Sequence, residues 1–397
     1  MSEQMTRMKG LQSNPAHERL LLTIVPLFWF AQYIFIPYQT PYLTSLGVSP
    51  SLIGIVVGSY GFAQLILRLP VGLLADRRGR HKPFILLGVA SAGIASLFRI
   101  LFPGELGFLI GNLLSGLASA MWISFMVLFF TYFPKDKLGK ASGLIVGANN
   151  FGILMGFVAG MLLYEPYGMT LLCILSAASA VPTFLLSTGI KEQHDGHDAL
   201  PVRELVRVYA DKRLIIFALL ALIQQGIQLS TAMSFTTQVA HARGANGVQI
   251  GVCSIIYMVT AVLSSYFSGT GFARRLGVSF WIPAIFVGLA AYCLLIPNLP
   301  SVEWIYVAQI LSGLATGILF SSCTAEAMKN IPKEKSSTAM GFYQAVYAVG
   351  MTTFPILTGA ITDAFDIRTA FYALAGTAVV GLAGALAFYW NARRVSI

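Results

Sequence analysis

The segment Gly72-Leu73-Leu74-Ala75-Asp76-Arg77-Arg78-Gly79-Arg80-His81-Lys82 is a short, basic stretch between two long apolar runs, residues 51–73 and 83–103. Each run is about 20 residues long, the length that a helix needs to cross the hydrocarbon core of a bilayer. The segment is therefore predicted to be a tight polar connection between two membrane-spanning helices.

The composition of the whole chain favours the same interpretation. Of its 397 residues, 56% are hydrophobic and 11% are charged, whereas an ordinary soluble domain is roughly 25% charged. The 42 charged side chains (26 basic plus 16 acidic) are too few to cover a soluble fold of this size. These numbers exclude a soluble enzyme, a disordered protein and a secreted disulfide scaffold, and they predict an all-α integral membrane protein.

The apolar runs predict twelve transmembrane helices. They cover residues 20–44, 51–73, 83–103, 106–132, 139–164, 169–189, 213–238, 248–270, 279–297, 302–328, 337–363 and 368–391. If the N-terminus is cytoplasmic, 22 of the 26 Lys and Arg residues fall on the cytoplasmic side, and only Arg99, Arg243 and Arg368 fall outside. Both termini are therefore expected in the cytoplasm, with the chain in the plasma (inner) membrane. The net charge of +10 then reflects topology and anionic lipid rather than nucleic acid.

The chain also repeats itself at half its length. At an offset of 197 residues, Leu114–Ala118 aligns with Leu311–Ala315 and Tyr60 aligns with Tyr257. Several matches in order at this offset predict two pseudo-symmetric six-helix bundles, with the site between them near the middle of the bilayer. The expected bundles are residues 1–189 and 213–397, joined by a cytoplasmic linker at 190–212.

The linker and the cysteines offer no cofactor site. The linker contains His194, Asp195, His197 and Asp198, and we expect these side chains to be solvated rather than bound to a metal. The four cysteines have no CxxC spacing and are expected to be apolar fillers. No metal and no cofactor are predicted.

The segment quoted first resembles the loop signature of the major facilitator superfamily, G-x-L-a-D-r-x-G-r-[RK]. Gly72, Asp76 and Gly79 occupy its defining positions. The resemblance implies that Asp76 caps the eleventh helix across the interface between the halves, a favourable position for a carboxylate. It also implies that Arg77 and Arg80 join a cytoplasmic charge network. In the second half Ala273 replaces the aspartate while Arg274 and Arg275 remain, so this latch is expected to be one-sided.

Two further family signatures are only partly matched. Residues 152–160 resemble the antiporter signature GxxxGPxxGG, with Phe157 in place of the usual proline, although such small residues also serve ordinary helix packing. The arginine that the family carries in the fourth helix is replaced by Asn112, which weakens a proton relay by analogy.

Two charged residues inside the spans are candidates for the mechanism. Arg68 is the one basic residue placed well inside a predicted span, where ionisable groups are costly and usually functional; the alternative is an interhelical clamp. Glu326 is expected to pair with Arg274 or Arg275 as a gate, or else to carry a proton.

The resemblance implies that the first, fourth, seventh and tenth helices line a central cavity. Asn112, Ser115, Ser119 and Trp122 share one face of the fourth helix. The full set of candidate cavity residues is Trp29, Gln32, Gln39, Asn112, Ser115, Trp122, Gln224, Gln228, Gln309 and Ser312. Polar side chains at membrane depth face protein or water, so hydrogen bonding between helices is the alternative for any one of them. A neutral cavity of this kind suits an uncharged or amphiphilic small molecule.

These observations predict a monomeric secondary active transporter that works by alternating access. Efflux of a small organic molecule coupled to proton entry is the leading expectation. The alternative is uptake or facilitated diffusion of a neutral solute such as a sugar. An enzyme is not expected, because no histidine lies in a predicted span, and a sensor without flux would need a larger soluble output region.

Overall fold

A computed structural model describes residues 15–78, 80–133, 138–192, 207–268, 275–332 and 335–395. Within these ranges the regular structure is helical throughout, with no strand. The first half contains α2 (Pro15–Tyr33), α3 (Ile36–Ser45), α4 (Pro50–Arg78), α5 (Lys82–Leu101), α6 (Glu105–Ala120), α7 (Trp122–Thr131) and α8 (Leu138–Thr188).

The second half follows a 3-10 turn, η3 (Arg207–Ala210). It contains α10 (Lys212–Ser230), η4 (Thr231–Phe235), α11 (Thr236–Ala242), α12 (Gly247–Ser268), α14 (Val278–Leu295), η5 (Ile296–Asn298), α15 (Val302–Leu314), η6 (Ala315–Leu319), α16 (Phe320–Met328), α17 (Ser336–Ala364) and α18 (Ile367–Val395).

Eleven of the described helical segments are long and apolar enough to cross a membrane, and one of them is two spans. The segment Ala141–Thr188 has 48 residues, which would make a helix about 72 Å long, far beyond a hydrocarbon core of about 30 Å. Gly168 interrupts α8 with φ 71° and ψ −174°, a conformation that glycine adopts without steric cost. The chain reverses there, which makes twelve spans and confirms the predicted all-α membrane fold.

The spans are numbered here in chain order. Span 1 is α2 with α3, span 4 is α6 with α7, spans 5 and 6 are the two arms of α8, span 7 runs from α10 to α11, and span 10 runs from α15 to α16. Spans 2, 3, 8, 9, 11 and 12 are α4, α5, α12, α14, α17 and α18. An even number of spans puts both ends of the chain on one side of the membrane, which we call the termini side; the other is the opposite side.

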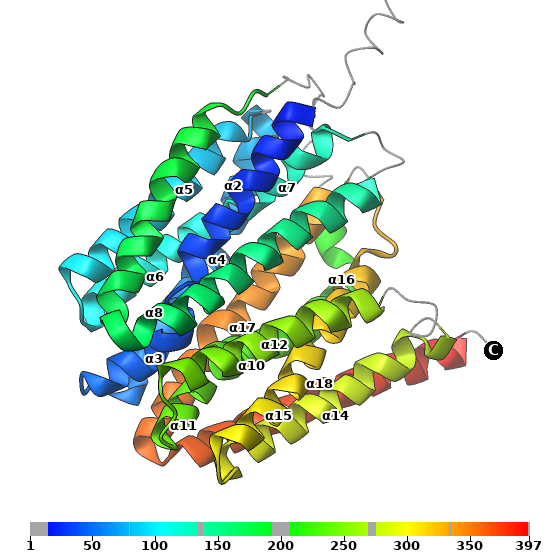
Figure 1. Cartoon of the computed structure of the whole chain (residues 1–397). Coiled ribbons are helices and arrows are strands. Elements are labelled where there is room, and N and C mark those ends of the chain that lie inside the picture. Colours follow the sequence, from blue (N-terminus) through cyan, green and yellow to red (C-terminus); the bar gives the residue numbers. More distant parts are fainter. Residues whose placement is uncertain are drawn as a thin grey trace, which may run out of the picture.

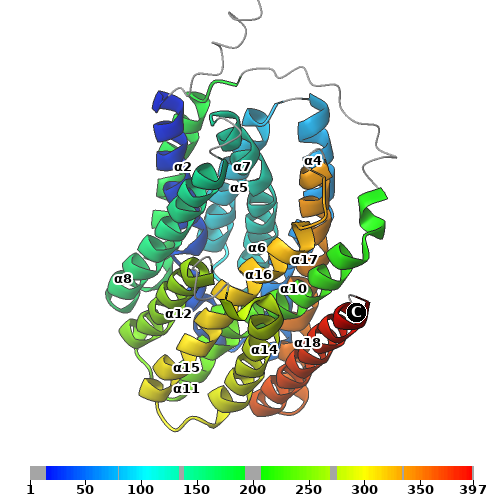
Figure 2. The same ribbon diagram turned by 90° about the vertical axis from the view of Figure 1, so that its right-hand side faces the viewer.

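The spans form two bundles that meet along two pairs of helices. Figure 1 shows the first bundle at the upper left and the second at the lower right, with α17 between them, and Figure 2 shows the same arrangement from the side. Glycines allow the close approach: a Cβ at Gly54 of α4 would collide with the Pro355 carbonyl of α17. A Cβ at Gly251 of α12 would lie 2.5 Å from the Met161 side chain of α8. Spans 2 and 11, and spans 5 and 8, are therefore the contacts that join the halves.

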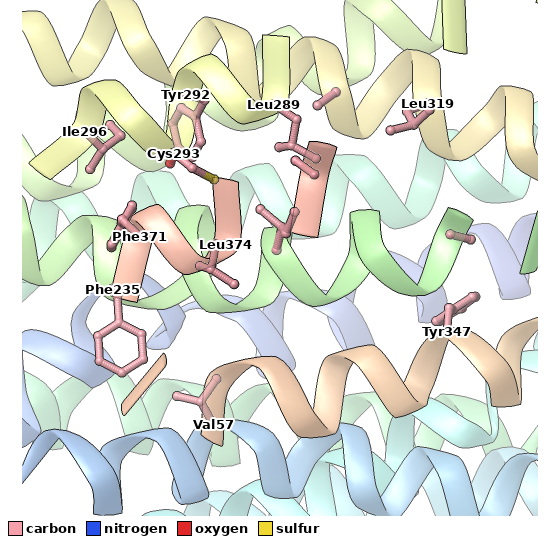
Figure 3. Packing of buried hydrophobic residues seen from close by; sticks show 14 of the residues in the cluster. Val57, Phe235, Leu289, Tyr292, Cys293, Ile296, Leu319, Tyr347, Phe371 and Leu374 are labelled. Carbon is pink, nitrogen blue, oxygen red and sulfur yellow. The ribbon is translucent and has the colours of Figure 1, made fainter. Parts of the chain in front are cut away.

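The apolar core also crosses the interface. The largest buried cluster includes Ile53 and Val57 from the first half together with Phe235 and Tyr292 from the second. Figure 3 shows Val57 on one side of this packing and Phe235 facing it. Buried apolar side chains from both halves therefore pack against one another at the interface between the two bundles.

Candidate functional site

The four helices that the sequence assigned to a central cavity share a backbone feature. Each is interrupted within its span: span 1 at residues 34–35, span 4 at Met121, span 7 by the π-helical segment η4, and span 10 by the π-helical segment η6. The other described spans run as continuous helices, apart from the turn at Gly168 and terminal turns. Interrupted helices inside a membrane are typical of binding sites. The interruptions therefore single out these four spans as the candidate functional region.

A small cavity lies where spans 1, 2, 4 and 7 meet. Four of the predicted cavity residues, Gln32, Gln39, Asn112 and Ser115, line it. The rest of its wall consists of Tyr33, Ile36, Val57, Tyr60, Leu229 and Met233. Its volume of about 30 Å³ holds about two water molecules. All polar side chains of the lining come from the first half, which also contributes Ile36 and Val57, and span 7 contributes only Leu229 and Met233.

The polar wall is backed by a buried arginine. Arg99 of α5 is only 2% exposed, and its Nη2 donates to Asn112 Oδ1 at 2.9 Å and to Ser115 Oγ at 2.8 Å. Asn112 Nδ2 in turn donates to the Val56 carbonyl at 2.8 Å. We call this series of hydrogen bonds, which connects span 3 to span 4 and span 4 to span 2, the first-half clamp. Arg99 was expected at the outer end of its span; its side chain turns inward between helices rather than outward to water.

The second half contains the same arrangement with a different donor. Tyr292 of α14 donates from its hydroxyl to Gln309 Oε1 at 3.0 Å, and Gln309 Nε2 donates to the Cys253 carbonyl at 3.4 Å. Cys253 and Gln309 are 197 residues after Val56 and Asn112, so the amide-to-carbonyl hydrogen bond follows the sequence repeat, whereas the donors to the amide, Arg99 and Tyr292, are not at matching positions. This second-half clamp runs from span 9 through span 10 to span 8 and is neutral.

A second pair of contacts repeats at the same offset. Tyr60 and Ser119 share a hydrogen bond of 2.8 Å, and their mates Tyr257 and Thr316 share one of 3.2 Å. The repeat thus preserves contacts between helices as well as residue types. Tyr60 was not among the predicted cavity residues, although its match with Tyr257 was the signal that could have identified it.

Other predicted cavity residues take part in hydrogen-bond networks or aromatic packing instead. Gln224 Nε2 donates to Gln228 Oε1 at 3.0 Å, and Gln228 Nε2 donates to the Tyr257 hydroxyl at 2.5 Å. Trp29 and Trp122 pack edge to face with ring centroids 5.4 Å apart. None of these four residues lines the small cavity.

Two of the predicted residues belong to the second-half clamp and also lie away from the cavity wall. Gln309 is fully buried and Ser312 is 1% exposed. Ser312 lies one turn after Gln309 on the same helix, α15. Their position mirrors that of Asn112 and Ser115, but span 10 does not contribute to the small cavity.

Arg68 lies in the termini-side half of span 2 and contacts the other bundle. Its guanidinium lies 4.9 Å from the ring centroid of Tyr347, and its Nη1 donates to the Gln344 carbonyl at 3.3 Å. Both partners belong to α17. Arg68 therefore contacts an aromatic ring and a carbonyl of the other half, and its Nε has no partner.

The predicted gating residues are described only in part. Gly79 and Arg274, and the side chains of Asp76 and Arg77, lie outside the described part of the chain, while Gly72 lies within α4 and Arg80 is exposed. The linker residues His194, Asp195, His197 and Asp198 are also outside it. Among the residues that are described, no group of three or more His, Cys, Asp or Glu side chains could hold a metal ion.

Glu326 has a different partner from the one expected. Its carboxylate forms an ion pair with Arg213, at the start of span 7, and lies 3.8 Å from Lys329 Nζ. Arg275 is exposed and is not among the described ion-pair partners of Glu326, while Arg274 lies outside the described residues, so pairing with Arg274 stays a prediction. Arg213 reaches Glu326 because both side chains lie at the termini-side ends of adjacent helices.

The halves are joined most closely at the opposite side. The Tyr38 hydroxyl donates to the Gly247 carbonyl at 3.1 Å, and Thr40 and Ser234 share a hydrogen bond of 2.8 Å. Two carboxylates contribute as well: Glu165 accepts from the Gly247 N–H, and Asp363 accepts from Ser51 Oγ, both at 2.6 Å. The cavity is therefore closed toward the opposite side.

Comparison with known sequences gives one family. The profile described as Major Facilitator Superfamily matches twice, over residues 21–241 and 214–396. The inner membrane transport protein YajR of Escherichia coli is 25% identical over 94% of this chain and 84% of its own length. A multidrug resistance efflux pump PmrA homolog of Lactococcus lactis is 26% identical over 90% of each chain. The multidrug resistance protein MdtG of Citrobacter koseri is 27% identical over 81% of this chain and 80% of its own.

Solved structures show the same fold. The nucleoside transporter NupG has a TM-score of 0.77 at 14% identity, and the match covers 94% of this chain and 99% of NupG. A bacterial homolog of the lysosomal transporter Spinster, in an inward-facing and unoccupied conformation, has a TM-score of 0.75 at 14% identity over 94% and 96% of the two chains. At this level of identity the likeness concerns the fold alone.

Proposed function

Because the chain belongs to the Major Facilitator Superfamily, we propose that it transports a small organic molecule across the inner membrane by alternating access. The observation that carries this proposal is the small cavity at the junction of the halves, closed on one side by hydrogen bonds between them. A transporter needs such a site, together with a closure that can break while the site persists.

We place the termini in the cytoplasm, so that the closed side faces outward and the conformation is inward-facing. The excess of Lys and Arg on the termini side supports this orientation. Single cysteines at positions 195 and 244 test it, because the four native cysteines are buried and should give little background. A membrane-impermeant maleimide added to intact cells should label position 244 and spare position 195. The reverse pattern would overturn the orientation.

Efflux coupled to proton entry is the transport mode that we propose. A relative named as a multidrug resistance efflux pump, the PmrA homolog of Lactococcus lactis, supports the direction. Glu326 supports the coupling, since it is the only buried carboxylate among the described side chains. Its ion pair with Arg213 joins spans 10 and 7, two of the interrupted helices, so a proton on Glu326 would weaken a contact between moving parts.

Proteoliposomes with an internal pH-sensitive dye provide the test. Addition of substrate should drive a proton flux in the wild type, and Glu326→Gln should abolish that flux while substrate counterflow continues. Glu303→Gln is the matched control, because Glu303 is exposed at the opposite side, and it should behave as the wild type. Undiminished proton flux in Glu326→Gln would remove this residue from coupling.

Uptake or facilitated diffusion of a neutral solute is the alternative mode. It predicts counterflow without any proton flux in the wild type. We further propose that residues 1–189 and 213–397 are the two bundles, with 190–212 as the linker, and that the transporter acts as a monomer without a cofactor. The mass of the purified protein in detergent, measured by light scattering, tests the oligomeric state.

A further inference from the structure

An apolar groove runs along the outside of the first bundle, between spans 3 and 6. Its volume is about 600 Å³, and every residue that lines it is apolar. Span 3 contributes residues between Val89 and Ile100, and span 6, the second arm of α8 (green in Figure 1), contributes residues between Ile174 and Leu185. Each stretch is about 16 Å of helix, which is about half of a hydrocarbon core of about 30 Å. The groove therefore has the length of the acyl chain of one leaflet.

The groove exists because small residues face each other where the two helices meet. A Cβ at Gly93 of span 3 would lie 3.0 Å from the Cβ of Ala180 of span 6, so the helices approach closely there. Ala177 lines the groove beside them, while Ile94 and Val181 form exposed flanks. Close helix contact through small residues leaves no long side chain to fill the space above it. The groove is thus open to the surface that faces lipid.

The second half fills the corresponding place with its own side chains. At the repeat offset of 197 residues, Val89 aligns with Phe286 and Ala177 aligns with Leu374. Phe286 is fully buried and Leu374 is buried, both in the largest apolar cluster. A Cβ at Gly381 of span 12 would collide with the Phe286 ring of span 9. An open groove is therefore a property of the first half and is not required by the repeat.

A lysine lies at the termini-side end of the groove. Lys82 begins α5, and its Nζ donates to the Thr188 carbonyl at the end of α8 at 2.6 Å, so the ammonium bridges the two helices that form the groove. Leu185, a lining residue, is about 4.5 Å before Thr188 along the helix. The distance suits a charged headgroup at Lys82 with its acyl chain in the groove.

The charge of Lys82 is not compensated by the described side chains. An ammonium has three donors, and the Thr188 carbonyl takes one of them. Among the described residues no carboxylate forms an ion pair with Lys82 Nζ. The nearby carboxylate of Glu192 accepts instead from the backbone N–H groups of His81 and Lys82. The ammonium can therefore donate to an anionic group from outside the chain.

We propose that this groove binds an anionic phospholipid of the cytoplasmic leaflet, with its phosphate at Lys82 and one acyl chain between spans 3 and 6. Basic positions between membrane helices on the cytoplasmic side are typical sites for anionic headgroups. A zwitterionic lipid fits the groove equally well but brings a cation of its own toward the ammonium. The lipid site goes beyond the proposed function and takes from it only the cytoplasmic location of the termini.

Native mass spectrometry of the delipidated full-length protein tests the proposal. The protein is titrated with dioleoylphosphatidylglycerol and with dioleoylphosphatidylcholine, which share their acyl chains and differ in net charge. The measured quantity is the dissociation constant of the first lipid bound. Phosphatidylglycerol should bind about fivefold more tightly, the contribution of one lysine near an anionic headgroup. Equal binding of the two lipids would overturn the proposal.

Two variants separate the headgroup contact from the chain contact. Lys82→Gln should weaken binding of phosphatidylglycerol about fivefold and leave that of phosphatidylcholine within about twofold. Ala177→Leu introduces the residue that the second half has at this position. It should weaken binding of both lipids about tenfold, because it removes apolar contact with about two methylene groups. If Ala177→Leu does not fold, Ala178→Leu, which also enlarges a lining residue, takes its place.

Each variant has a matched control away from the groove. Lys212 is exposed at the start of span 7, and Ala373 is exposed on span 12. Lys212→Gln and Ala373→Leu should bind both lipids as the wild type does. An unchanged preference in folded Lys82→Gln, or unchanged binding of both lipids in the folded leucine variant of the groove, would overturn the proposal.

The same measurements reveal a different occupant of the groove. A dimer mass that Ala177→Leu converts to a monomer mass, without a preference for phosphatidylglycerol, would show a second copy of this chain there and overturn the lipid site. Substrate counterflow in proteoliposomes separates the lipid site from the proposed function. Counterflow without any lipid preference would leave the transporter standing and remove the lipid site. A preference that depends on Lys82, without counterflow, would keep the lipid site and contradict transport.

Discussion

The two clamps are built on one plan and differ in charge. In each half an amide side chain of the interrupted helix donates to a carbonyl 56 residues earlier, Asn112 to Val56 and Gln309 to Cys253. The donor to that amide is the Arg99 guanidinium in the first half and the Tyr292 hydroxyl in the second. The repeat therefore preserves the contact between the amide and the carbonyl, whereas the donor to the amide differs in both charge and position: Arg99 aligns with Ile296, and Tyr292 aligns with Ala95.

Removal of the amide should break the charged clamp more severely than the neutral one. Asn112→Leu leaves a buried charged donor without its acceptor, and we expect a loss of about 2–3 kcal/mol in unfolding free energy. Gln309→Leu should cost about 1 kcal/mol, because Tyr292 keeps its 2.7 Å contact with Thr236. Denaturation of the two variants in detergent measures the difference. Equal losses would show that the charge of Arg99 is compensated elsewhere.

Replacement of a packing glycine by alanine should destabilise the protein by a similar amount in either half. A Cβ at Gly116 would collide with the Tyr60 carbonyl, and a Cβ at Gly313 would lie 2.7 Å from the Tyr257 carbonyl. Gly116→Ala and Gly313→Ala should therefore each cost about 2 kcal/mol by overpacking. Melting temperatures and yields of monodisperse protein measure both. A loss confined to one half would show that the packing is less symmetric than the repeat implies.

The loop between spans 2 and 3 should matter more than its mate in the second half. Asp76→Asn should remove most transport from folded protein, because a carboxylate aimed at a helix end contributes about 0.3–2 kcal/mol. A change of that size shifts a two-state ratio by up to about thirtyfold. The matched control is Ala273→Asn, which removes no charge and should transport normally. The measurement is the transport rate per folded molecule. A wild-type rate in Asp76→Asn would contradict the role of Asp76 as a latch between the halves.

The smallest expected difference concerns the starts of spans 3 and 9. Burial lowers the pKa of His81 below its ordinary value of 6.5, and the nearby Glu192 opposes the shift. The unfolded chain then binds a proton that the folded protein resists, so stability is lost as the pH falls below about 6.5. Span 9 follows Gly277, which cannot titrate. His81→Asn should reduce the fall in melting temperature between pH 7 and pH 5. Gly277→Asn should leave the pH dependence of the melting temperature unchanged.

The sequence predicted part of the candidate site and missed part of it. Gln32 and Asn112 line the cavity as predicted, because a polar amide in an apolar helix has to face protein or water. Tyr33 and Tyr60 were missed, since a tyrosine packs equally well in a core, a cavity or an interface. The burial of Arg99 was missed because the residue stands near the end of an apolar run, where an arginine commonly extends toward water.

The sequence by itself determined the number of spans, the two-fold repeat and the family, because each depends on local hydropathy or on residues at fixed spacing. The resemblance to the family also singled out spans 1, 4, 7 and 10, whose backbones prove to be interrupted. Only the tertiary structure decided which side of the cavity is closed, and that Arg68 reaches span 11 and Arg99 reaches span 4. The physical reason is that a periodic pattern specifies the face of a helix, whereas the direction of a long side chain and its partner depend on the neighbouring helix.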